Sequence, residues 1–122
     1  MDTRSLAIAL SAGRVLAGVG LVAAPSRAAA GWIGPEADLP SVQVVIRALG
    51  VRDLALGVGT IAAFRGGDPT PWVIAGIASD AVDLGATVAG GRSLPPTGRV
   101  GVALIAAAAA VTGTVVLRSL RS

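Results

Sequence analysis

The chain has 122 residues, of which 53 % are hydrophobic and 14 % are charged, and its formal net charge is +3. Soluble domains carry about a quarter charged residues, so this composition is that of a single membrane domain. The chain contains no cysteine and no histidine, which excludes disulfides, zinc sites built from these ligands, haem ligation by histidine, and Ser-His or Cys-His catalytic pairs.

Four apolar segments occupy most of the sequence, and each has the length of about 20 residues that a helix needs to cross the hydrocarbon core. They predict an all-α fold, a four-transmembrane-helix bundle that forms one domain over residues 1–122. The predicted helices cover about residues 5–24, 41–64, 71–89 and 99–117. An obligate all-helical soluble oligomer remains the alternative.

The first segment, residues 5–24, carries Arg14 near its middle. Its layout resembles a signal peptide, because Arg4 precedes an apolar stretch and small residues follow at 27–31. Arg14, however, splits the apolar region. We therefore expect a retained membrane helix.

The connection from residue 25 to residue 40 is the longest polar stretch. Pro25, Pro35 and Pro40 argue against a regular helix here. Trp32 suits the headgroup level of a bilayer, where an amphipathic ring is favoured. We expect an irregular connection at a membrane surface.

The second segment, residues 41–64, is long enough to cross a bilayer but carries Arg47, Arg52 and Asp53. Its apolar side chains contribute about −5 kcal/mol to insertion, whereas three ionised groups at mid-depth would cost roughly +9 kcal/mol. The segment therefore needs partners for its charges before it can enter a bilayer.

The third segment, residues 71–89, contains Asp80 and Asp83, which share one face of a helix because they are three residues apart. An unpaired ion in a low-dielectric interior costs several kcal/mol, so we expect a paired network that joins the first three segments. The fourth segment would pack outside it through small residues such as Ala109 and Gly113. The predicted network consists of Arg14, Arg47, Arg52, Asp53, Asp80 and Asp83.

Two interpretations of this network stay open. It could fix the register of the helices without binding anything, or it could line a cavity, since ionisable residues inside membranes commonly mark sites. The second interpretation predicts a binding site for a small amphiphilic or lipophilic ligand or for a partner helix.

Two further functions are compatible with the same residues. One is a membrane-embedded enzyme acting on an isoprenoid or polyketide, in which Asp53, Asp80 or Asp83 is the general acid. The other is a compact proton-coupled transporter of small molecules. Small multidrug-resistance exporters carry a glutamate in their first helix, where this sequence has Arg14.

Other motifs are set aside. Asp80-Ala-Val-Asp83 resembles the paired aspartates that hold magnesium in membrane-bound isoprenoid transferases, but the other carboxylates of those families are absent, so no metal is expected. The Gly-x-Gly pairs at 18–20 and 57–59 lie within predicted helices, so no nucleotide cofactor is expected. The arginines are scattered among very few aromatic residues, so no nucleic-acid partner is expected.

Four crossings place both termini on one side of the membrane. Arginine counts in the end regions favour cytoplasmic termini in a multi-pass protein of the plasma membrane, by a margin of one residue. The lipid bilayer is the expected partner. Four thin, glycine-rich helices enclose little volume, so a homodimer is a further expectation.

Residues 47–57, R-A-L-G-V-R-D-L-A-L-G, and residues 79–85, S-D-A-V-D-L-G, together resemble a family of small four-helix membrane proteins of actinobacteria. This family is defined by a domain of unknown function. The resemblance covers about half of the chain. It implies the four-helix topology and implies no activity.

Overall fold

The computed structural model describes residues 2–122, and within this range the chain forms five α-helices, two 3₁₀ turns and no strand. The prediction of an all-α fold is confirmed. The α-helices are α1 (Thr3–Ala23), α2 (Pro25–Ile33), α3 (Pro40–Gly66), α4 (Thr70–Gly90) and α5 (Pro96–Arg121), and the 3₁₀ turns are η1 (Pro35–Asp38) and η2 (Gly91–Ser93).

The long helices begin where the sequence supplies a proline or a capping carboxylate. Proline occupies one of the first two positions of α3, α4 and α5, where its missing N–H costs no hydrogen bond. Asp2 caps α1 by accepting a hydrogen bond from the backbone nitrogen of Ser5 at 2.7 Å. This hydrogen bond lowers the pKa of the exposed Asp2 carboxyl.

The expectation of an irregular connection at residues 25–40 is wrong. Its first part is the helix α2, in which Pro25 is the first residue, so the proline starts a helix instead of preventing one. Gly34 then ends α2 with a φ of 93°, a left-handed conformation that glycine adopts without strain. The 3₁₀ turn η1 leads on to α3.

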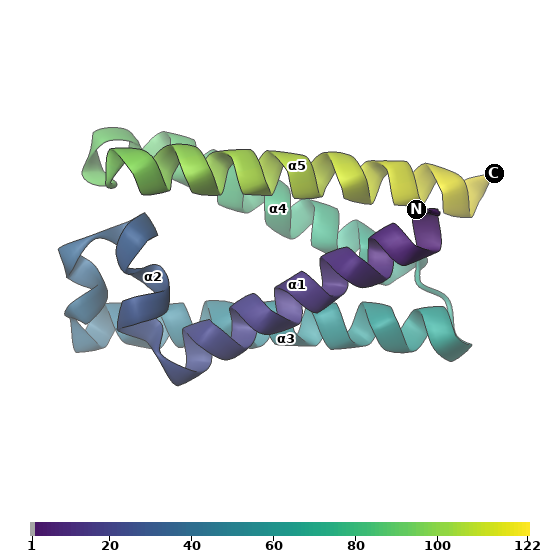
Figure 1. The fold of residues 1–122 in the computed structure, drawn as a ribbon, viewed down its shortest axis with the longest axis horizontal. Helices are drawn as coiled ribbons and strands as arrows, with labels where there is room; N and C mark the ends of the chain where they lie inside the picture. The colour runs from purple at the N-terminus through teal and green to yellow at the C-terminus, as the bar shows by residue number, and fades with distance from the viewer. Residues whose placement is uncertain (1) are drawn as a thin grey trace.

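The four long helices form two antiparallel pairs, α1 with α3 and α4 with α5, which make the most extensive contacts in the molecule. Figure 1 shows these pairs as two layers, with α2 closing one end. The start of α1, the end of α5 and the connection from α3 to α4 lie at the opposite end. Contacts between the two layers are fewer. The fold therefore depends on the specific interactions that join one layer to the other.

Glycines bring the backbones of α1 and α3 into direct contact. A Cβ atom on Gly18 would lie 2.6 Å from the carbonyl oxygen of Gly50, and one on Gly57 would lie 2.6 Å from the carbonyl oxygen of Ser11. No side chain fits between the helices at these points. Small residues allow this close approach in helices that lack a hydrophobic driving force for association.

Three helices combine the length and apolar composition that a bilayer crossing needs, namely α1, α4 with the following 3₁₀ turn, and α5. Many of their large apolar side chains face outward, among them Leu16 and Ile105. These features indicate a membrane protein. The helix α3 differs, because any 18-residue stretch of it contains Arg52 and Asp53 with either Arg47 or Arg65.

Candidate functional site

Asp80 of α4 forms a buried ion pair with Arg14 of α1. The distances from the guanidinium are 3.0 Å for Nη1 to Oδ1 and 2.5 Å for Nη2 to Oδ2, so both carboxylate oxygens accept a hydrogen bond. Only 12 % of the Arg14 side chain and 7 % of the Asp80 side chain are exposed. This two-bond geometry makes the pair strong and directional.

Asp83, one turn further along α4, forms the second pair with Arg52 of α3. Its oxygens accept hydrogen bonds from Nη1 at 3.1 Å and from Nη2 at 2.7 Å. Asp53 accepts a third hydrogen bond, from Arg52 Nη2 at 3.2 Å. Arg52 therefore pairs with two carboxylates, whereas Arg14 pairs with one.

The spacing of the aspartates explains how α4 joins both helices of the other layer. Residues three apart lie on one helical face, and this face of α4 meets Arg14 from α1 and Arg52 from α3. Gly76 belongs to the same face, and its carbonyl oxygen accepts a hydrogen bond from Arg14 Nη2 at 3.3 Å. The ion pairs between arginines and aspartates expected from the sequence are therefore present and bridge the two layers.

Arg47 lies outside this network. The residue is exposed, and its Nε donates a hydrogen bond to the carbonyl oxygen of Val22, near the end of α1, at 3.3 Å. Within residues 2–122 the network thus contains two guanidinium groups and three carboxylates. The balance of three charges of each sign expected from the sequence is not present there.

A cavity of about 390 Å³ lies against the network. Its polar lining comes from all three aspartates and Arg14, and its apolar lining comes from α1 and α5. The α5 wall differs from the expectation that the fourth segment packs outside the network, because Val102, Ile105 and Ala106 line the same cavity as the aspartates. These residues belong to a stretch without ionisable groups, so the sequence contains no signal for their position. Only the packing of α5 beside α1 and α4 brings these side chains to the aspartates.

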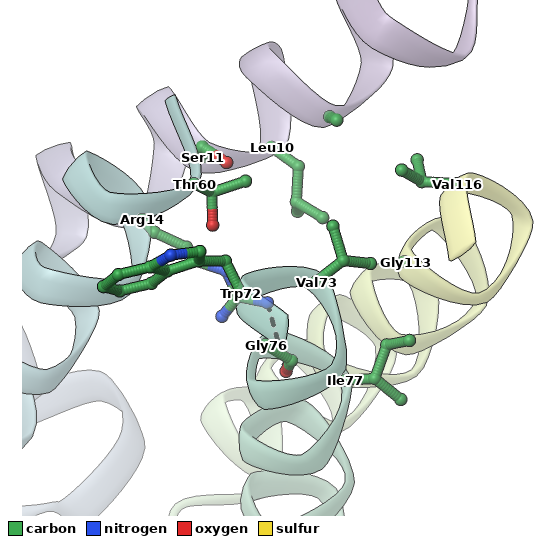
Figure 2. Close-up of a pocket in the computed structure, with 11 residues that line it drawn as sticks. Leu10, Ser11, Arg14, Thr60, Trp72, Val73, Gly76, Ile77, Gly113 and Val116 are labelled. Atoms are coloured by element: carbon green, nitrogen blue, oxygen red, sulfur yellow. Dashed lines mark hydrogen bonds between the residues drawn. The ribbon is translucent and has the colours of Figure 1, made fainter. Parts of the chain in front are cut away.

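A second cavity, of about 20 Å³, is also lined by Arg14 and has room for about one water molecule. Ser11, Thr60 and Trp72 contribute to its lining, and Figure 2 shows the hydrogen bond from Arg14 to the carbonyl of Gly76 beside it. It is too small for an organic ligand. The larger of these two cavities is the candidate site, because all three aspartates and Arg14 line it.

Trp32 has a specific partner in the protein. Its Nε1 donates a hydrogen bond to Thr87 Oγ1 at 3.1 Å, which ties α2 to the end of α4. Thr87 is among the most buried residues of the described chain. Trp32 therefore fixes α2 across the end of the bundle.

Comparisons with protein-family models, curated proteins and solved structures find no match to this chain. The resemblance to the actinobacterial family stays a prediction. In residues 2–122, no group of three or more histidine, cysteine, aspartate or glutamate side chains is arranged to hold a metal ion.

Proposed function

We propose that this chain is a multi-pass protein of the plasma membrane whose larger cavity binds a small amphiphilic or lipophilic ligand. The observation that carries the proposal is the division of the cavity lining into a charged wall and an apolar wall. Its volume of about 390 Å³ falls in the range of about 300–1,000 Å³ that small-molecule sites occupy. No separate observation favours the enzyme or the transporter, so the proposal is confined to binding.

The proposal includes a fourth crossing by α3. Arg52 and Asp53 of this helix are paired with each other, and Arg52 is also paired with α4, which lowers the cost of burying them. The face that α3 turns outward carries exposed apolar side chains, including Val44, Val51 and Val58. An apolar outer face with internally paired charges suits a helix surrounded by lipid.

Cysteine labelling tests the fourth crossing, because the natural chain has no cysteine. Gly31 lies in α2, before α3, and Gly66 is the last residue of α3. A Cβ at either position meets no atom within 4 Å, so Gly31→Cys and Gly66→Cys mark the two ends of this helix. With α3 across the bilayer, an impermeant maleimide added to intact cells labels only one of the two variants. Labelling of both variants, or of neither until the cells are lysed, would show that α3 does not cross.

A cavity-filling substitution tests the binding site. Gly13 lines the cavity, and a Cβ there meets nothing within 4 Å, so Gly13→Leu fills the cavity without displacing the backbone. The matched control is Gly85→Leu, which makes the same change at an exposed helical glycine of α4 that is equally open and outside the cavity lining.

Binding is measured by equilibrium dialysis with the protein in phosphatidylcholine nanodiscs, after subtraction of uptake by empty discs. The probes are tetraphenylphosphonium, tetraphenylborate and neutral triphenylphosphine oxide, which differ in charge. We expect at least one probe to bind saturably, with an affinity that falls at least tenfold in Gly13→Leu and is unchanged in Gly85→Leu. Absence of saturable binding by all three probes, or equal losses in both variants, would contradict the proposal.

A further inference from the structure

The charges around the larger cavity do not balance. Arg14 and Asp80 form a one-to-one pair, whereas Arg52 is shared between Asp83 and Asp53. Arg47, which would have neutralised the group, is turned away to the carbonyl oxygen of Val22. The network therefore carries one carboxylate charge more than its guanidinium groups can offset.

Asp53 is the least well neutralised of the three aspartates. It accepts one hydrogen bond from Arg52, at 3.2 Å, while Asp80 and Asp83 each accept two from an arginine. Its side chain is only 14 % exposed, and it lines the cavity. The second oxygen of Asp53 thus remains available to a ligand in a largely desolvated place.

The lining of the larger cavity is more negatively charged than the network as a whole. All three aspartates line this cavity, but Arg14 is the only arginine that does so among the described residues, and Arg52 is not part of the lining. A cation placed beside Asp53 would meet an uncompensated opposite charge in a medium of low dielectric, where such attraction is strong. An anion would add to the excess charge, and a neutral ligand would leave it unchanged.

We propose that the cavity selects cationic amphiphiles, namely lipophilic ammonium or phosphonium compounds. This inference rests on the proposed function and specifies its ligand class. The cationic group lies beside Asp53, and the apolar body packs on the α5 wall formed by Val102, Ile105 and Ala106. Charge complementarity therefore provides the specificity, and the apolar wall provides most of the contact area.

The comparison of tetraphenylphosphonium with tetraphenylborate in the nanodisc assay tests this selectivity, because the two ions have nearly the same shape and opposite charge. We expect the phosphonium to bind the natural protein at least tenfold more tightly than the borate. Equal affinities, or tighter binding of the borate, would overturn the inference. This comparison needs no variant, so it decides the matter even if substitutions impair folding.

Asp53→Asn then assigns the selectivity to one residue. We expect a loss of about tenfold in phosphonium affinity, equivalent to about 1.4 kcal/mol, and no change for neutral triphenylphosphine oxide. Glu36→Gln is the control, because it removes a carboxylate at the outer end of the bundle, in η1, and should leave both affinities unchanged. An unchanged phosphonium affinity in folded Asp53→Asn would refute the role of Asp53.

The two proposals fail in different ways. If no probe binds saturably, the cavity is not a ligand site and the proposed function fails. If the probes bind and Gly13→Leu weakens them all, but cation and anion bind alike, the site stands and only the cation selectivity is wrong.

Discussion

Asp80→Asn is expected to destabilise the protein by about 3–5 kcal/mol, because it leaves the guanidinium of Arg14 buried without an opposite charge. The two side chains are 12 % and 7 % exposed, so most of the guanidinium is withheld from bulk water. Their pair also joins α1 to α4, and therefore one layer of the bundle to the other. The free energy of unfolding in mixed micelles, followed by circular dichroism over a denaturant series, measures the loss.

Two controls distinguish the effect of an unpaired charge on stability from the effect of altered packing. Removing both partners, with Arg14→Met and Asp80→Leu together, should restore most of the stability, since replacing a buried pair by apolar groups is often neutral or better. Asp83→Asn should cost less than Asp80→Asn, because Arg52 keeps Asp53 as a partner. If Asp80→Asn unfolds at the same denaturant concentration as the natural protein, the pair does not hold the layers together.

These variants also distinguish the two interpretations of the network that the sequence left open. A loss of stability in Asp80→Asn, combined with a loss of phosphonium binding alone in Asp53→Asn, would assign different tasks to neighbouring carboxylates. The Arg14–Asp80 pair would be structural, and Asp53 would serve the ligand. A scaffold and a binding site are then two parts of one cluster.

The sequence was sufficient to predict that the aspartates of α4 would meet arginines, because spacing alone puts Asp80 and Asp83 on one face. It also held a signal that would have excluded Arg47. Arg47 and Arg52 are five residues apart, which at 3.6 residues per turn turns them about 140° away from each other. A count of charges predicts both arginines in one network, because it ignores the directions in which they leave the helix.

Other features depend on tertiary packing and left no such signal. The α5 wall of the cavity consists of valine, isoleucine and alanine, and these residues are as common on faces that contact lipid. The prediction lacks α2 for a different reason, because it treats Pro25 as a helix breaker although proline is favoured in the first turn of a helix. Local patterns predicted the long helices, but not what closes the end of the bundle.

Gly18→Ala is the second substitution with a large expected effect, a loss of about 1–3 kcal/mol from overpacking. The added Cβ would lie 2.6 Å from the carbonyl oxygen of Gly50 and 2.8 Å from the backbone nitrogen of Leu54. Both atoms belong to the backbone of α3, so no side-chain rotation relieves the contact and the two helices must move apart. The same denaturant series measures this loss.

Gly13→Ala on the same helix is the matched control, because a Cβ at that position has no atom within 4 Å. There the higher helix propensity of alanine should leave stability unchanged or raise it by up to about 1 kcal/mol. The two changes are identical and lie five residues apart. If Gly18→Ala lowers the free energy of unfolding and Gly13→Ala raises it, then α1 and α3 touch through their backbones at Gly18. Equal effects would mean that the helices are separated there, and the arrangement that brings Arg14 to Asp80 would then lack its support.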